Sequence, residues 1–182
     1  NRSRTFLFIG TMACAFAIGV LTHRDRVGEM VWQKLHWDRL ALIISERDVV
    51  LKERIGSYYF NGGAYDLDKA EKYYTELLKV REYTKIASYQ LARIYFVKGD
   101  PFLSKKFLDQ NLQQYPDWKQ SHYIRGLVNV YLGDFEEAAQ DFEIFIDWKP
   151  EEWGAYNDLA WAYLKAGEYE KAWRATERGI KK

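Results

Sequence analysis

The pattern of hydrophobic and polar positions divides the chain into an uncharged N-terminal run and a longer, helix-like remainder. Residues 5–22 contain no charged side chain, and charged residues flank this run on both sides. These 18 residues would cover about 27 Å at helical rise, close to the hydrocarbon thickness of a bilayer. A buried helix of a soluble domain would normally show polar residues on one face. The run therefore predicts one transmembrane helix within an anchor segment at 1–23, so that the lipid bilayer is contacted through residues 5–22.

Two rival interpretations of this run fit less well. A cleaved signal peptide has a shorter apolar core, usually about 7–15 residues. A lipoprotein signal needs a box of small residues before its cysteine, and Thr11-Met12-Ala13 before Cys14 matches such a box poorly. The predicted localisation is thus a single-pass membrane protein with an N-terminal anchor. The flanking basic residues do not decide on which side the rest of the chain lies, because long domains can cross regardless of flanking charge.

Residues 24–48 follow as a juxtamembrane segment with apolar residues at roughly helical spacing. Trp32 and Trp37 come soon after the uncharged run, where tryptophan often lies at the lipid–water boundary. We expect an amphipathic helix here. Two interpretations stay open: the helix lies on the membrane or against a partner subunit, or it packs at the start of the region that follows.

Residues 49–182 show internal repetition, the strongest pattern in the chain. Four series recur at a step of 34 residues: Gly99, Gly133 and Gly167; Ala70, Ser104, Ala138 and Ala172; Ala92, Gly126 and Ala160; Pro116 and Pro150. The predicted repeat units lie near residues 49–84, 85–118, 119–152 and 153–182. A period of this length is typical of helix–turn–helix units that stack on one another.

The repeats resemble the tetratricopeptide-repeat (TPR) family residue by residue. The last unit carries the family pattern at Tyr156, Leu159, Ala160, Tyr163, Gly167 and Ala172. The resemblance implies an all-α fold, a TPR solenoid of helical hairpins in a right-handed superhelix, preceded here by the transmembrane helix. Small residues would let the two helices of a hairpin approach closely, and large ones such as Leu108 and Phe142 would fill the space between hairpins.

Some positions depart from the family pattern. Asn129 stands where the family prefers Tyr. Ser104, Asn111, Phe145 and Gly179 replace a preferred Ala. We expect local repacking at these places. Pro101 begins a second helix, where proline is tolerated.

Composition and motifs exclude several function classes. The 27 basic and 26 acidic side chains give no basic excess of the kind that nucleic-acid binding needs. The single cysteine excludes an intrachain disulfide, and the three histidines form no metal-ligand spacing with Cys, Asp or Glu. The sequence contains no phosphate loop, dinucleotide fingerprint or nucleophile elbow. We therefore predict a non-enzyme with no catalytic residue, cofactor, metal or nucleic-acid partner.

The resemblance implies that successive first helices line a concave, protein-binding face. Residues one turn apart on these helices form the predicted partner-binding groove: Tyr89, Arg93, Phe96, Tyr123, Leu127, Tyr131, Asn157, Trp161 and Leu164. Five of the nine are aromatic, which suits an apolar or helical ligand. The alternative is that these aromatic side chains are internal packing or are covered by the juxtamembrane segment. The lysine, asparagine and arginine clamp of TPR co-chaperones is not found at the corresponding places, which hold Glu53, Ser57, Tyr89, Gln90, Arg93 and Ile124.

These expectations combine in a membrane-anchored protein that mediates protein–protein interaction. The first hypothesis is a scaffold or accessory subunit in the assembly of a membrane protein complex, with other membrane-embedded subunits as partners. The alternative is a receptor or chaperone-like factor for assembling or translocating polypeptides, and a third is a regulatory domain detached from a catalytic chain. The second helix of the last repeat carries Trp173 and Ile180. Because repeat arrays need a polar capping element, we expect a further helix or a partner to cover that end.

Overall fold

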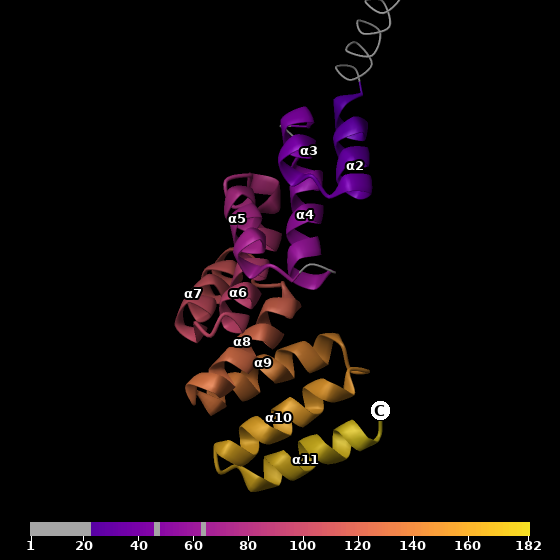
Figure 1. The fold of residues 1–182 in the computed structure, drawn as a ribbon. Helices are drawn as coiled ribbons and strands as arrows, with labels where there is room; N and C mark the ends of the chain where they lie inside the picture. The colour runs from indigo at the N-terminus through magenta and orange to yellow at the C-terminus, as the bar shows by residue number, and fades with distance from the viewer. Residues whose placement is uncertain (1–22, 46–47, 63–64) are drawn as a thin grey trace, which may run out of the picture. The chain divides into compact units, whose positions relative to one another are not determined.

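The computed structural model describes residues 23–45, 48–62 and 65–182. Over these residues the chain forms ten α-helices and one short 3-10 helix, without a strand (Figure 1). The predicted all-α fold is confirmed for this part. The uncharged run 5–22, where we expected the transmembrane helix, lies outside the described residues. Among the helices that are described, none is long and apolar enough to cross a membrane.

The chain divides into two compact units, one up to Tyr65 and one from Asp66 to Lys182. The first contains α2 (Arg24–Leu35), α3 (Asp38–Ile44) and α4 (Val49–Asn61). The predicted repeat unit 49–84 therefore extends over parts of both, and the predicted domain limits stay a prediction. The segment 24–48, expected as one helix, holds two, because His36 ends α2 in the left-handed conformation (φ 51°, ψ 34°).

Packing within the first unit depends on one small and one large residue of α2. A Cβ on Gly28 would lie 2.8 Å from the carbonyl oxygen of Ala41, so only glycine permits this approach of α2 and α3. Trp32 is buried, and its ring lies 5.7 Å, edge to face, from that of Tyr58 on α4. Trp32 therefore packs inside the protein, whereas Trp37 is exposed.

The second unit is a row of helical hairpins. Its helices are α5 (Leu67–Leu77), α6 (Thr84–Val97), α7 (Pro101–Gln114), α8 (Lys119–Leu132), α9 (Phe135–Trp148), α10 (Trp153–Lys165) and α11 (Tyr169–Ile180), with the 3-10 helix η1 (Arg81–Tyr83) before α6. Helices α6 and α7, α8 and α9, and α10 and α11 pair as hairpins, and α7 contacts α8 as α9 contacts α10. Three of the four expected helix–turn–helix units lie within this unit as hairpins.

The glycines that recur every 34 residues lie in the turns inside the hairpins. Gly99, Gly133 and Gly167 have φ of +83°, +89° and +80°, a conformation that other residues rarely adopt. At the following helix start, the Asp100 carboxylate accepts a 2.9 Å hydrogen bond from the amide of Leu103, and Pro101 occupies the first turn. Each hairpin thus reverses at a glycine, and α7 begins with a capped first turn.

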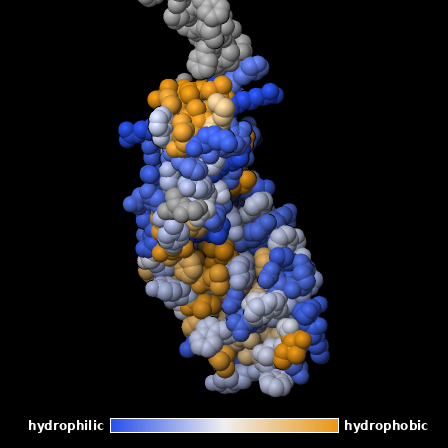
Figure 2. All heavy atoms as spheres, turned by 45° about the vertical axis from the view of Figure 1, so that its right-hand side comes forward, coloured by the Kyte–Doolittle hydropathy of each residue, from blue (hydrophilic) through white to orange (hydrophobic). Residues whose placement is uncertain are grey.

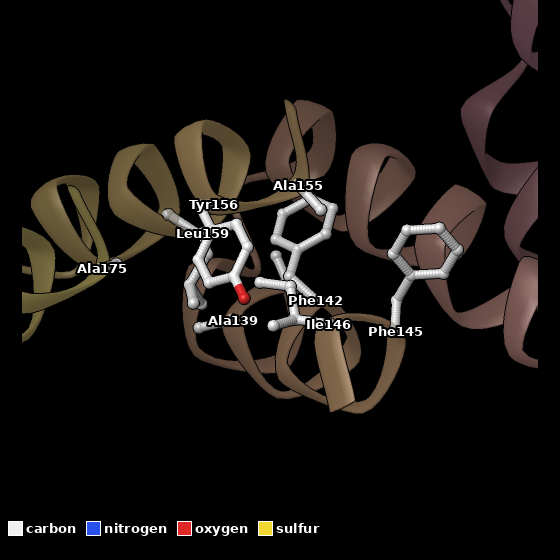
Figure 3. Packing of buried hydrophobic residues seen from close by; sticks show 10 residues of the cluster. Ala139, Phe142, Phe145, Ile146, Ala155, Tyr156, Leu159 and Ala175 are labelled. Carbon is white, nitrogen blue, oxygen red and sulfur yellow. The ribbon is translucent and has the colours of Figure 1, made fainter. Parts of the chain in front are cut away.

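Small residues bring the helices of each hairpin together, as predicted. A Cβ on Gly126 would lie 2.6 Å from the Phe142 ring, so the approach of α8 to this ring on α9 requires glycine. Between hairpins, α9 and α10 share an apolar core (Figure 3). Tyr156 and Leu159 of α10 point toward Phe142 and Ile146 of α9 in this core. Burial of this kind is the main stabilising contribution in stacked repeats.

Candidate protein-binding groove

The nine predicted groove residues lie on three neighbouring helices. Helix α6 contacts α8, and α8 contacts α10, so the first helices of the three hairpins lie in one row. The structure places three of the residues on each helix: Tyr89, Arg93 and Phe96 on α6; Tyr123, Leu127 and Tyr131 on α8; Asn157, Trp161 and Leu164 on α10. The row resembles a groove wall, but its members differ in what they contact.

On α6 the predicted residues are half-buried and already organised. The Arg93 guanidinium lies 5.7 Å from the Tyr89 ring centroid and donates a 2.8 Å hydrogen bond to the side-chain oxygen of Gln90. The Tyr89 ring meets Trp118 edge to face at 6.2 Å. Burial raises the pKa of the Tyr89 phenol. The α6 part of the row therefore offers a held cation next to aromatic faces.

Phe96 and Tyr131 lie near the C-terminal ends of α6 and α8 and connect the two helices. Their rings meet edge to face with centroids 6.0 Å apart. Phe96 is half-buried, whereas Tyr131 remains 70% exposed. Tyr131 thus keeps most of its surface available to a partner.

Tyr123 and Leu127, at the centre of the row, are packing residues. The Tyr123 ring lies 4.7 Å from that of Phe145, and its hydroxyl donates a 2.8 Å hydrogen bond to Asp158 on α10. Burial, and then the bond to Asp158, raise the pKa of Tyr123. Leu127 packs on the same α9–α10 core. For these two residues the interpretation as internal packing describes the contacts better than that of a free groove surface.

The α10 residues are the most open. Asn157, Trp161 and Leu164 are exposed and line a hollow of about 580 Å³ together with residues of α11. The Lys165 ammonium lies 4.7 Å from the Trp161 ring centroid. The structure therefore brings these three predicted residues together around one concavity.

A polar network on α8 escaped the sequence analysis. The Asp141 carboxylate on α9 is buried and accepts hydrogen bonds from Arg125 Nε (2.9 Å) and Nη2 (2.8 Å), and it lies 2.7 Å from His122 Nδ1. Arg125 also donates to Asp109 on α7 at 2.9 Å. Burial alone would raise the pKa of Asp141, but the bonds from His122 and Arg125 outweigh it and hold that pKa below its usual value. This network connects α8, the helix that carries Tyr123 and Leu127, to α9 and α7.

The network also explains one departure from the family pattern. Asn129, where the family prefers Tyr, accepts a 2.9 Å hydrogen bond from the Lys105 ammonium of α7. Lys105 in turn pairs with Glu137 at 3.0 Å. The unusual asparagine was the only sequence signal of these contacts, and its partners lie in other helices.

The groove residues are suited to recognition. They present aromatic faces, a guanidinium and an amide, groups that are common at protein interfaces. Within the described ranges, no group of three or more His, Cys, Asp or Glu side chains could hold a metal ion.

Comparisons with known proteins place the fold. No curated protein matches the chain by sequence. A crystal structure of MamA has a TM-score of 0.74 at 18% identity, covering 89% of this chain and 91% of MamA. MamA 41-end from Desulfovibrio magneticus RS-1 has a TM-score of 0.72 at 16% identity, covering 87% and 94%. At these identities the similarity shows the fold alone. By sequence, residues 123–181 match the tetratricopeptide repeat family, so this stretch carries TPR repeats within a chain whose fold is similar to that of MamA.

Proposed function

We propose that this chain is a non-enzymatic scaffold or accessory subunit of a membrane protein complex. In this proposal residues 5–22 hold it in the bilayer, and the row of first helices α6, α8 and α10 binds a segment of a partner subunit. The TPR match over residues 123–181 supports the interaction role. The uncharged run, followed by charged residues, supports the membrane attachment.

One observation carries the binding proposal: large apolar side chains stay exposed near the C-terminal ends of α8 and α10. Tyr131 is 70%, Trp161 48% and Leu164 45% exposed, although the same helices bury apolar residues against their neighbours. Exposed large apolar side chains of this kind, two of them lining the α10 hollow, are typical of interaction sites. We therefore assign binding chiefly to Tyr131 and the α10 residues, and a supporting role to Tyr123 and Leu127.

The chemical groups of the groove indicate which kind of ligand it would bind. Aromatic and aliphatic surface fits the apolar side of a helical or extended segment. Arg93 on α6 and Lys165 on α10 lie against rings of the row, where each could also meet a carboxylate of the ligand. The expected ligand is a segment with apolar side chains and at least one acidic residue.

The test is affinity purification of the full chain from detergent extracts of its own membranes, with quantitative mass spectrometry. Trp161→Ala and Tyr131→Ala should each weaken retention of a stoichiometric membrane partner by about 2 kcal/mol, a typical hot-spot loss. Phe102→Ala is the matched control, because Phe102 is an exposed aromatic residue on the second helix α7. If both groove variants retain the partner as wild type does, the groove proposal is wrong.

Two further outcomes separate the hypotheses. Many weakly held chains in place of one stoichiometric partner would favour the receptor or chaperone-like alternative. Carbonate washing of membranes tests the anchor, because a chain held by a transmembrane helix stays in the pellet, and release of the intact chain would contradict the anchor. The anchor and the groove can therefore fail independently.

A further inference from the structure

We propose that one end of the α2–α3 hairpin is a second membrane contact, which sits among the headgroups of an anionic bilayer. This end, the hairpin tip, consists of Arg24 and Arg26 in the first turn of α2 and of Leu40 and Ile43 on α3. The contact rests on the proposed anchor at residues 5–22. It would fix how the hairpin stands on the membrane, which an anchor alone leaves free.

Backbone contacts place the end of α3 beside the start of α2. The hydroxyl of Ser45, the residue after α3, donates a 2.7 Å hydrogen bond to the Arg24 carbonyl. One turn further along α2, a Cβ on Gly28 would lie 2.8 Å from the carbonyl oxygen of Ala41. Helix α3 therefore runs back along α2, and its last turn lies at the level where α2 begins.

The start of α2 is also the described part of the chain closest in sequence to the proposed anchor. Arg24 stands two positions after Thr22, the last residue of the uncharged run. Two residues reach at most about 7 Å even when fully extended. With residues 5–22 in the bilayer, Arg24 lies at the lipid–water boundary, and the end of α3 that is bonded to it comes to the same depth.

The side of α3 that faces away from α2 is apolar and open. Ile43 is 74% and Leu40 39% exposed, and residues three apart lie on the same side of a helix. Ala41 and Ser45, on the side towards α2, are buried. Figure 2 shows a hydrophobic cluster, flanked by hydrophilic residues, on the part of the molecule formed by α2 and α3. Transfer of such side chains from water to the membrane boundary is favourable.

The charge of the tip fits phosphate headgroups. Side chains on a helix lean towards its N-terminus, so Arg24 and Arg26 lean towards the end of α2 that follows the anchor. Asp25 lies between them, which leaves one positive charge in excess, and the next acid on α2, Glu29, is paired with Arg54 of α4. The positive end of the α2 dipole adds to this excess. A basic segment next to the membrane is attracted by anionic lipid.

The experiment measures lipid contact at single positions of the full chain in nanodiscs. Cys14→Ala removes the only native thiol, and a bimane fluorophore is attached at Ile43→Cys. The matched control is Leu35→Cys, because Leu35 is also exposed and apolar but ends α2, about 17 Å from Arg24 along the helix. The nanodiscs contain lipid brominated near the headgroup, which quenches nearby fluorophores, and are either anionic phosphatidylglycerol or zwitterionic phosphatidylcholine.

We expect the fluorophore at position 43 to lose most of its emission in anionic nanodiscs and clearly less in zwitterionic ones. The fluorophore at position 35 should keep its emission in both. The double variant Arg24→Glu, Arg26→Glu should lose the quenching at position 43 in anionic nanodiscs. Its helical circular dichroism should stay unchanged, because glutamate in a first turn favours a helix start.

Co-elution of the chain with the nanodiscs in size-exclusion chromatography reports on the anchor separately. Co-elution without quenching at position 43 overturns the tip contact and leaves the anchor standing, whereas a chain that does not co-elute overturns both. Equal quenching at positions 35 and 43 also overturns the tip contact, because the hairpin then lies flat along the bilayer. Quenching that is the same in both lipids, or that persists in the double variant, overturns the selection of anionic headgroups.

Discussion

The two junctions between successive hairpins of the second unit differ in their polar contacts. The polar junction, where α7 meets α8, buries the apolar residues Ala92, Leu108 and Val128. It adds hydrogen bonds of Ser88, Lys105, Asp109, Asn111, Ser121, Arg125 and Asn129. The apolar junction, where α9 meets α10, is made by Phe142, Phe145, Ile146, Ala155, Tyr156, Leu159 and Ala162. One repeat register therefore supports two ways of joining hairpins.

Asn111 shows how specific the polar junction is. Its side-chain nitrogen donates to the Lys85 carbonyl at 2.8 Å and to the Ser88 hydroxyl at 2.7 Å. Its side-chain oxygen accepts from the Ser121 hydroxyl at 2.7 Å. One buried amide thus ties α6, α7 and α8 together, and a small displacement of any of them would break a bond.

The difference separates the contacts that mainly stabilise the fold from those that set the relative positions of the helices. Apolar contacts are non-directional, so the apolar junction contributes free energy and tolerates some sliding. Buried hydrogen bonds are satisfied in one arrangement only, so the polar junction defines the position of α8 relative to α6. That position brings Phe96 and Tyr131 together on the groove. We expect changes at the apolar junction to lower stability most and changes at the polar junction to alter the groove as well.

The largest effect is expected from Phe142→Ala at the apolar junction. Phe142 is fully buried, and truncation removes its contacts with α8 and α10 and leaves a cavity. The free energy of unfolding should fall by about 4 kcal/mol, measured by urea denaturation. Phe102→Ala, at an exposed position on α7, should stay within about 0.5 kcal/mol of wild type. Equal losses in the two variants would contradict the assignment of this core.

Asp141→Ala should have the next largest effect. The variant leaves the Arg125 guanidinium and His122 without their buried carboxylate, and breaking such a pair costs about 3 kcal/mol. The control is Asp109→Ala, whose side chain is half-exposed and should contribute less than about 1 kcal/mol. If the control is as costly as Asp141→Ala, the burial of Asp141 is not what matters.

The same carboxylate predicts a pH dependence. Because its pKa in the folded protein lies below the ordinary value of 3.8, folding is favoured by its ionised form. This contribution is present above about pH 4 and is lost as the pH falls through the folded-state pKa. Asp141→Asn should therefore lose less stability than wild type between about pH 4 and pH 2, measured as urea midpoints across that range. Parallel pH profiles would contradict the pKa direction.

The sequence predicted the apolar part of this comparison far better than the polar part. The 34-residue register placed the glycine turns and the small residues facing Phe142, because these follow from helix spacing alone. It marked Asn111 and Asn129 as departures but explained them as repacking. Their partners could not be found by spacing, since Lys85 and Ser88 lie 26 and 23 residues from Asn111.

Helical spacing placed the groove residues on one side of their helices but did not predict which of them are exposed. Helical spacing put Tyr123 and Tyr131 on one side of α8, two turns apart. What separates them is the neighbouring hairpin, which covers Tyr123 with Phe145 and binds its hydroxyl through Asp158. Tyr131 lies beyond that cover and stays exposed. The exposure of a side chain on a helix depends on which neighbouring helices cover it. The spacing of residues along that one helix carries no information about its neighbours.

Asn111→Ala is expected to show a smaller effect with a distinct signature. The change restores the residue that the TPR family prefers, yet it removes three hydrogen bonds and leaves the buried Ser121 hydroxyl without its acceptor. Stability should fall by about 2 kcal/mol, measured by urea denaturation. Gln113→Ala, at an exposed position on the same helix, is the control. A neutral or stabilising Asn111→Ala would show that the family pattern, and not the hydrogen-bond network, governs this junction.

Ser104→Ala should have the smallest effect and thereby test what makes a polar contact costly. The buried Ser104 hydroxyl donates to the Ala92 carbonyl at 2.7 Å, and Ala again is the family's choice. This carbonyl lies inside α6 and keeps its helical hydrogen bond when the hydroxyl is removed, so no buried group loses its only partner. We expect a loss of at most about 1 kcal/mol, clearly less than for Asn111→Ala in the same assay. Equal losses in the two variants would mean that the number of hydrogen bonds, rather than the groups left unsatisfied, determines the contribution of the polar junction.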